Sequence, residues 1–293
     1  MKRRFSRKET LPLTPSLILI PLYQNFFHFL DLIEKGEDAW PLYWRYYYFP
    51  YRKFFDAYFA LFPLLDRQAL KIRVGAIKPN HYSRLRSLLK NRQAEKIIGK
   101  IHQHCLKIAP PEKNRPIKVY LMIGFFSPEA FLLSLGQEKV IVFGLERFRD
   151  LAFLDLLYAH EYAHYLLQEK SFEIADERKA SWYLLSEGLA CWFSSLVLPG
   201  RPLTDYLFLR RDRFNWCLEN EALLKKIFKL FKQDLEKIMR LQQQGDQSLG
   251  LPPRTLHFLA YRAIEKYQKQ EKDLTFRKLI QQPEKLLSLN LAD

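Results

Sequence analysis

Apolar residues recur at helical spacing along most of this chain, and two short runs rich in β-branched residues interrupt them. The clearest helical segment lies between residues 149 and 170, which include neither proline nor glycine. Its buried stripe follows the i, i+3, i+4, i+7 pattern through Leu156, Leu157, His160, Ala163, His164 and Leu167. Two histidines therefore lie on the apolar face of the predicted helix.

The two β-branched runs, residues 117–125 and 139–145, predict a pair of strands before this helix, with Gly136 in the turn that precedes the second. An extended peptide can pair with an exposed strand edge through main-chain hydrogen bonds, without demanding a particular sequence. We expect Val140–Gly144 to be such an edge strand. The alternative is an ordinary core strand, and the pattern is compatible with both.

The other elements are predicted to be helical. Residues 22–62 are crowded with aromatic side chains and fit two helices broken near Gly36 and between Pro41 and Pro50. They predict a packed helical layer, or alternatively a wall of a substrate groove or a membrane-surface contact. One or two helices are expected over 81–108, basic helices over 206–245, and a last helix within 252–270. The predicted fold class is α+β and mostly helical. It comprises an aromatic-rich N-terminal region (1–110) and a catalytic region (111–293), which could form one continuous domain.

The buried helix carries the sequence His160-Glu161-Tyr-Ala-His164. Residues four apart project from one helix face, so both imidazoles can hold one Zn²⁺, and Glu161 lies where it can take a proton from a metal-bound water. Zinc lowers the pKa of bound water to about 7. A single buried histidine is more often a core residue, but two on one turn beside a glutamate favour a metal. The pattern predicts hydrolysis, most often of a peptide bond.

A catalytic zinc needs a third protein ligand and one open position. Glu187 lies in the middle of a mostly apolar helical stripe, where an unpaired carboxylate would be costly to bury. Small neighbours, Gly188 and Ala190, would let a second helix approach closely. We therefore expect His160, His164 and Glu187 to bind one zinc ion per chain. The competing candidates lie in a charged connection or on the same stripe: Glu173, Asp176, Glu177 and, as the least favoured, Cys191.

These segments resemble a known group. The sequence His160-Glu-Tyr-Ala-His164 followed by Ser186-Glu-Gly-Leu-Ala190 is similar to the gluzincin metallopeptidases. More closely, it resembles a mainly bacterial family of predicted zinc-dependent proteases with a downstream E-G-L-A segment. The resemblance implies a zincin-like fold with a small sheet beside the zinc helix, peptidase activity and a glutamate third ligand. A C-terminal segment of that family matches here at Arg254, Tyr261 and Arg262 and departs at Leu256, His257, Phe258 and Ala260.

The expected function is thus a zinc-dependent hydrolase, specifically a peptidase, acting on a peptide or protein with Glu161 as general base. The developing oxyanion needs a further donor. His257 is the first candidate because it begins a late helix, and Tyr261 and Arg254 follow. Asp176 and Glu177 are candidates for orienting the imidazoles. The alternatives are a zinc-bearing binding or regulatory protein without activity, and a basic adaptor for membranes or nucleic acid.

The net charge of +15 comes from 47 Lys and Arg against 32 Asp and Glu, and these bases are scattered along the chain. Scattered bases are typical of solvated helix faces, and no nucleic-acid motif appears, although peripheral association with anionic surfaces is compatible with the charge. No apolar run approaches the ~20 residues of a transmembrane helix. Three cysteines without a paired framework favour a reducing compartment, and the expected localisation is cytoplasmic. The sequence does not fix the oligomeric state.

Overall fold

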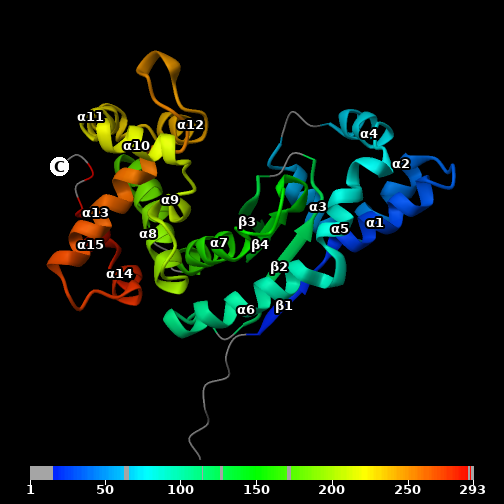
Figure 1. Cartoon of the computed structure of the whole chain (residues 1–293), viewed down its shortest axis with the longest axis horizontal. Coiled ribbons are helices and arrows are strands. Elements are labelled where there is room, and N and C mark those ends of the chain that lie inside the picture. The colour runs from blue at the N-terminus through cyan, green and yellow to red at the C-terminus, as the bar shows by residue number, and fades with distance from the viewer. Residues whose placement is uncertain are drawn as a thin grey trace, which may run out of the picture.

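The computed structural model describes residues 16–62, 66–113, 115–125, 128–169, 173–289 and 291. A small sheet lies in the middle of an elongated, mostly helical molecule (Figure 1). Its strands are β1 (Leu17–Ile20), β2 (Ile117–Met122), β3 (Ala130–Leu135) and β4 (Glu138–Gly144). The order across the sheet is β1-β2-β4-β3. β2 is parallel to both β1 and β4, while β3 and β4 form an antiparallel hairpin.

The sheet differs from the sequence prediction in which strand lies at the edge. β4, the expected edge strand, is an inner strand between β2 and β3, and all residues from Val140 to Gly144 are buried. The edge beside α7 (Leu154–Glu169) is β3, which we did not predict because its sequence, Ala-Phe-Leu-Leu-Ser-Leu, has no β-branched residue. β1 was also missed, since four apolar residues between prolines are too short a signal. β1 comes from the N-terminal region, so strands from both sides of residue 110 build the sheet.

The N-terminal region is helical, as predicted. Its elements are α1 (Leu22–Ile33), α2 (Ala39–Leu42), a π-helix (Tyr43–Tyr48), a 3₁₀ turn (Phe49–Tyr51), α3 (Arg52–Phe59), α4 (Arg67–Gly75), α5 (Ser83–Leu88) and α6 (Gln93–Ile108). Most of the aromatic side chains are buried core. Tyr47 anchors this layer to the sheet, because its hydroxyl donates to the carbonyl of Ile123 at 2.9 Å and accepts from the amide of Ile123 at 2.8 Å.

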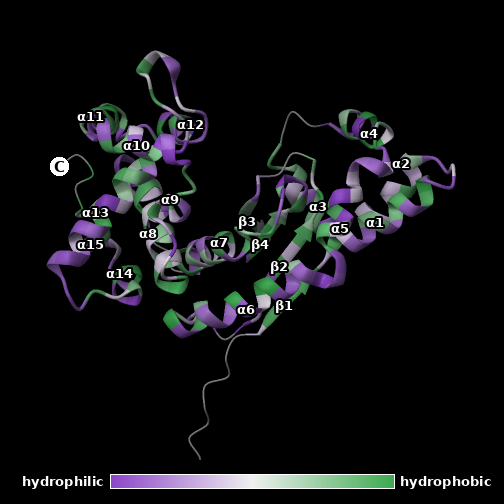
Figure 2. Cartoon of the chain, viewed as in Figure 1, coloured by the Kyte–Doolittle hydropathy of each residue, from purple (hydrophilic) through white to green (hydrophobic). Residues whose placement is uncertain are grey.

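The C-terminal half is entirely helical where it is described. Its helices are α7 (Leu154–Glu169), α8 (Lys179–Val197), α9 (Leu203–Tyr206), α10 (Arg211–Glu219), α11 (Glu221–Phe231), α12 (Leu235–Gln244), α13 (Leu256–Gln270), α14 (Phe276–Gln281) and α15 (Pro283–Leu287). The prediction that the chain ends on the helix within 252–270 was wrong, since α14 and α15 follow α13. Figure 2 shows α8 mainly in apolar colours, whereas the outer helices alternate between apolar and polar.

α8 is the central helix of this half, packed against α7 on one side and α13 on the other. A Cβ atom placed on Gly188 would lie 2.6 Å from the carbonyl carbon of Ala260 and 2.7 Å from the amide nitrogen of Tyr261. The predicted close approach of a second helix at Gly188 is therefore confirmed, and the second helix is α13. None of the described helices is both long and apolar enough to cross a membrane.

Candidate metal centre

The fold brings His160, His164 and Glu187 together, two of them on α7 and the third on α8. Nε2 of His160 lies 3.1 Å from Nε2 of His164. The carboxylate of Glu187 spans both rings, with Oε2 3.4 Å from Nε2 of His160 and Oε1 3.4 Å from Nε2 of His164. Among the described residues, these three form the group of histidine, cysteine and acidic side chains able to hold a metal ion.

The dimensions of this group fit a tetrahedral ion. Zinc bonds of 2.0–2.1 Å at the tetrahedral angle would separate adjacent ligand atoms by about 3.3 Å. The 3.1 Å between the two imidazole nitrogens is close to that value, and each ring has one carboxylate oxygen of Glu187 at 3.4 Å. Two imidazoles and one carboxylate also match the ligand set of catalytic zinc sites that keep a fourth position open. The residues present therefore fit the cofactor that the sequence predicts.

The electrostatics of the group favour a positive charge at its centre. Burial alone would raise the pKa of Glu187, but the neighbouring imidazoles of His164 and His160 hold it well below its usual range. Burial lowers the pKa of His164, yet the charge and hydrogen bond of Glu187 outweigh this and raise it overall. The carboxylate is thus held ionised between two imidazoles, where a proton or a metal cation can neutralise it.

Glu161 is buried beside this group without being one of its three ligands. Burial raises the pKa of its carboxyl group, the charges of His164 and His160 oppose the rise, and that of Glu187 adds to it. A carboxyl group with a raised pKa is a stronger base once ionised, which is the property a general base needs near neutral pH. The position and environment of Glu161 are therefore compatible with the predicted role.

The far side of the His160 ring is covered by Cys191 and Phe208. Sγ of Cys191 lies 4.0 Å from Nδ1 of His160, so this cysteine faces the other ring nitrogen and does not join the ligand group. The ring of Phe208 packs edge-on against His160 with 5.3 Å between centroids. Asp176, predicted as an orienting group, instead pairs with Lys179 with its side chain 91% exposed.

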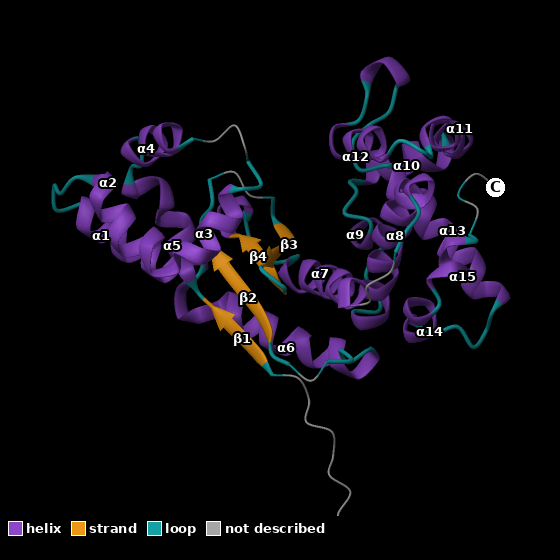
Figure 3. Cartoon of the chain, turned by 180° about the vertical axis from the view of Figure 1, so that it is seen from behind, coloured by secondary structure: helices purple, strands orange, loops and turns teal. Residues whose placement is uncertain are grey.

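The candidate ligands lie in an open cleft of about 570 Å³ between the sheet and the C-terminal helices. One wall is β3 with the residues before it, and Figure 3 shows β3 beside α7. The other wall comes from α8, α12, the segment before α13 and the first turn of α13, through Tyr183, Gln242, Arg254 and His257.

β3 presents main-chain groups to this cleft. The amide of Gly144 donates to the carbonyl of Glu129 at 3.1 Å, which aligns Glu129 with β4. In an antiparallel pair, every second residue forms hydrogen bonds to the neighbouring strand and the residues between them point their N–H and C=O groups the other way. Because Glu129 bonds to β4, Ala130 and Leu132 direct their N–H and C=O groups away from that strand. Both residues line the cleft. In the described part of the chain no strand pairs with this outer side of β3, so a strand edge runs past the candidate metal ligands.

The structure separates the three predicted transition-state donors. His257 lines the cleft, but its Nε2 donates to the carbonyl of Leu207 at 2.9 Å and its Nδ1 accepts from the amide of Gln242. Both ring nitrogens are thus engaged, and burial lowers the pKa of His257 to about 4. Tyr261 is absent from the cleft lining and lies near Ser195, about two turns of α8 beyond Glu187. Arg254 lines the cleft and pairs with Glu129, with 3.6 Å between Nη2 and Oε2.

Sequence reasoning missed the contribution of Tyr183 to the cleft. This tyrosine lies one turn before Glu187 on α8 and lines the same cleft. Its i, i+4 spacing from Glu187 was the signal that could have identified it. Burial and the charge of Glu187 raise the pKa of its hydroxyl, so the hydroxyl keeps its proton and remains a hydrogen-bond donor.

Comparisons of the chain with protein-family models, with curated proteins and with solved structures find no match. The arrangement of His160, Glu161, His164 and Glu187 in the cleft therefore carries the functional inference.

Proposed function

We propose that this chain is a zinc-dependent hydrolase, and specifically a peptidase. The observation that carries the proposal is the group formed by His160, His164 and Glu187, in which both imidazole nitrogens and the carboxylate lie within 3.4 Å of one another, with Glu161 buried next to it in an open cleft. A structural zinc site would be closed and would not need Glu161. The cleft beside the ligand group instead leaves room for a substrate.

The chain's own residues would divide the work as follows. His160, His164 and Glu187 hold the zinc ion, which supplies an acidified water and polarises a carbonyl group when it is bound. Glu161 accepts a proton from the attacking water and then donates it to the departing amine. Cys191 and Phe208 pack around His160 and fix the orientation of its ring.

A peptide substrate is supported by the edge of β3. Main-chain groups of Ala130 and Leu132 can pair with the backbone of an extended peptide and so hold its carbonyl groups in a fixed register beside the ligand group. This recognition is independent of side chains on the substrate. It favours an extended polypeptide over a compact small molecule.

Tyr183 is the best-placed donor for the developing oxyanion. Tyr183 lines the cleft from the same helix as Glu187, and its raised pKa keeps its hydroxyl protonated. His257 would have to give up the carbonyl of Leu207 to offer its N–H. We therefore assign the donor role to Tyr183. His257 has a positioning role, because its hydrogen bond to the carbonyl of Leu207 holds the backbone just before Phe208, which packs on His160. This assignment replaces the order expected from the sequence.

The first experiment is zinc stoichiometry by elemental mass spectrometry on protein purified without chelators. Wild type should carry about one zinc per chain, and Glu187→Gln should lose most of it. Glu173→Gln is the matched control, because this glutamate lies outside the ligand group and is exposed. Zinc near zero in wild type, or equal zinc in both variants, would remove the basis of the proposal.

Activity is tested on the zinc-loaded protein with a peptide library read by mass spectrometry. Wild type should generate new peptide termini, and Glu161→Gln should retain zinc but abolish them. Zinc binding without any cleavage by wild type would favour the alternative of an inactive zinc-bearing protein. Equal cleavage by wild type and Glu161→Gln would refute the general-base role.

A further inference from the structure

A second hollow of about 390 Å³ adjoins the metal cleft at one end. The two share Glu129, Leu157, Phe208 and Arg254 as lining residues, so they are parts of one continuous depression. Phe208 contacts His160 and also lines the second hollow. The hollow therefore begins within one side chain of a candidate metal ligand.

The second hollow, which we call the arginine pocket, differs in charge from the cleft. Four arginines and three acidic residues line it, a net charge of +1: Arg147, Arg149, Arg210 and Arg254, with Glu129, Asp150 and Asp205. Arg210 also contacts Asp212 at 3.3 Å, with both side chains mostly exposed. Of the described residues that line the metal cleft, only Arg254 is a lysine or arginine. Positive charge is thus concentrated at one end of the depression. Apolar side chains, Phe153, Leu157 and Leu209, complete the lining.

Arg254 is the guanidinium common to the cleft and the arginine pocket. Its backbone adopts a φ of 65°, an uncommon conformation for a residue with a side chain. The amide of Arg254 donates to the carbonyl of Gln242 at 2.7 Å, which holds this conformation in place. Its contact with Glu129 is long, at 3.6 Å, and both side chains are close to half exposed. A bidentate carboxylate ligand would bind Arg254 better than this exposed contact does.

The sheet topology indicates which end of a peptide would reach the pocket. Glu129, just before β3, lines both hollows, and its carbonyl accepts from the amide of Gly144 at the C-terminal end of β4. Arg147, Arg149 and Asp150, which follow β4, line the arginine pocket, whereas Phe131 and Leu132 line only the cleft. The arginine pocket therefore lies beyond the N-terminal end of β3. Antiparallel pairing is the more stable arrangement for an added strand. A peptide paired in this way runs opposite to β3, so its C-terminal end points to the pocket.

We propose that the arginine pocket binds a carboxylate on the C-terminal side of the scissile bond, either the chain terminus of the substrate or an acidic side chain. The inference rests on the proposed peptidase function and adds the substrate class to it. Guanidinium groups are suited to planar, bidentate recognition of carboxylates. The pocket also faces the N-terminal end of α7, where the helix dipole favours negative charge.

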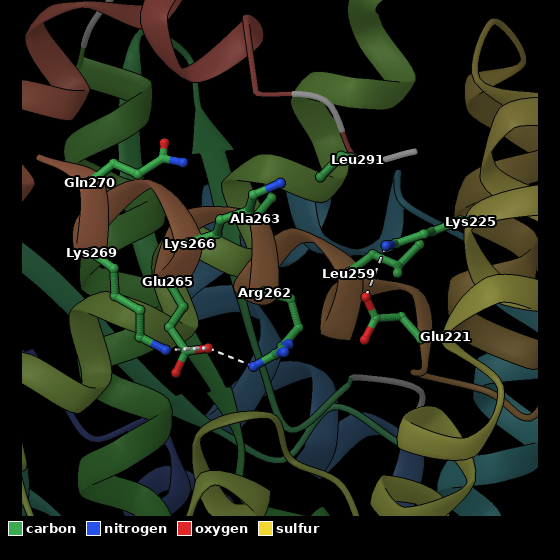
Figure 4. A pocket seen from close by; sticks show the side chains of 10 residues that line it. All are labelled: Glu221, Lys225, Leu259, Arg262, Ala263, Glu265, Lys266, Lys269, Gln270 and Leu291. Atoms are coloured by element: carbon green, nitrogen blue, oxygen red, sulfur yellow. Dashed lines mark hydrogen bonds and ion pairs between the residues drawn. The ribbon is translucent and has the colours of Figure 1, made fainter. Parts of the chain in front are cut away.

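The other large pocket, shown in Figure 4, lacks this character. It lies between α11 and α13, away from the candidate ligands. Of its four bases, Lys225 lies 3.0 Å from Glu221, Arg262 lies 2.7 Å from Glu265, and Lys269 lies 3.6 Å from the same Glu265. An anion would have to displace these carboxylates before it could bind those three bases.

The test measures binding, so it does not depend on turnover. Zinc-loaded wild type and Glu161→Gln would be titrated into fluorescein-labelled, alanine-rich hexapeptides and followed by anisotropy. One peptide has a free C-terminal carboxylate, a second is amidated, and two further amidated peptides carry aspartate or asparagine near the C-terminus. We expect at least one carboxylate peptide to bind ten-fold or more tighter than its neutral partner. The pair that differs identifies the source of the carboxylate.

Charge reversal then locates the effect. Arg254→Glu and Arg210→Glu should each abolish the preference, and a lysine-containing peptide should bind them better than it binds wild type. Arg211→Glu is the matched control, since it makes the same change of charge one residue from Arg210 but outside the pocket lining. Circular dichroism checks that each variant is folded.

Two results would overturn the inference: equal binding of carboxylate and neutral peptides, or an equal effect of Arg254→Glu and Arg211→Glu. Cleavage of the library by wild type is scored separately. Cleavage without any preference for acidic peptides would support the peptidase function and refute carboxylate binding in the arginine pocket. Tighter binding of carboxylate peptides without any cleavage would support carboxylate binding in the pocket and refute the peptidase function.

Discussion

His257 should make the stability of this protein fall as the pH falls, by an amount that can be worked out from its environment. The ring is buried, both nitrogens are hydrogen-bonded in the neutral form, and burial lowers its pKa from 6.5 to about 4. The unfolded chain therefore takes up a proton near pH 6.5, while the folded chain resists until about pH 4. The contribution of His257 to the free energy of unfolding is fully present above pH 6.5 and is lost progressively as the pH falls from 6.5 to 4.

The magnitude follows from the difference between the two pKa values. At pH 5 the unfolded histidine is almost fully protonated and the folded one is mostly neutral, which corresponds to a loss of about 2 kcal/mol relative to pH 7. The loss approaches about 3 kcal/mol below pH 4. Such amounts are large against a total stability of roughly 5–15 kcal/mol.

The substitution His257→Gln separates this effect from the other groups that titrate. A glutamine amide can still donate to the carbonyl of Leu207, but it does not take up a proton. Urea unfolding at pH 7, 6 and 5, in the presence of a chelator, should show that wild type loses about 2 kcal/mol more than His257→Gln between pH 7 and 5. His81→Gln, at an exposed histidine, controls for the loss of an imidazole. Parallel pH dependence of wild type and His257→Gln would refute the claim that the folded ring is held neutral.

Three further predictions test the packing, the donor and the strand edge. Gly188→Ala should lower the free energy of unfolding by about 1–3 kcal/mol, because the added methyl group meets the backbone of α13. Gly99→Ala, in the interior of α6 with open space around it, should instead stabilise by up to about 1 kcal/mol, and thermal unfolding of both variants gives the comparison. Tyr183→Phe should reduce kcat by about 10²–10³-fold with little change in KM, and an unchanged kcat would exclude the tyrosine as oxyanion donor. Leu132→Pro should raise KM for peptides while zinc content stays near one per chain, because it removes an outward N–H from the edge of β3; an unchanged KM would mean that peptides do not pair with this strand.

The sequence was most informative where a local pattern sets the geometry. Helical spacing alone places His160 and His164 on one face of α7. The cost of burying a carboxylate was enough to select Glu187 over three exposed alternatives. Both inferences depend on interactions within one helix or on burial, which hydrophobic periodicity reports directly.

The sequence was less informative about contacts between elements that are far apart along the chain. β3 was missed because leucine and phenylalanine without β-branching suit helices as well as strands, and only its pairing with β4 makes it a strand. The partners of His257 come from Leu207 and Gln242, and no sequence pattern links those positions. The i, i+4 spacing of Tyr183 from Glu187 puts both on one face of α8, but the access of Tyr183 to the cleft depends on how α12 and β3 are arranged around it.

The hydrogen bonds around His257 bear on the minimum length of chain that can hold the site. All three candidate ligands and Glu161 are encoded before residue 190. Yet the carbonyl of Leu207 accepts a hydrogen bond from the ring of His257 on α13, and Gln242 on α12 bonds to the other nitrogen of that ring. Phe208, the residue after Leu207, packs on His160. A fragment ending after α8 would keep every metal ligand and lose this outer support, as well as the surface that covers Gly188. Limited proteolysis in the loop between α12 and α13 should therefore release zinc even though it cuts no bond near a ligand.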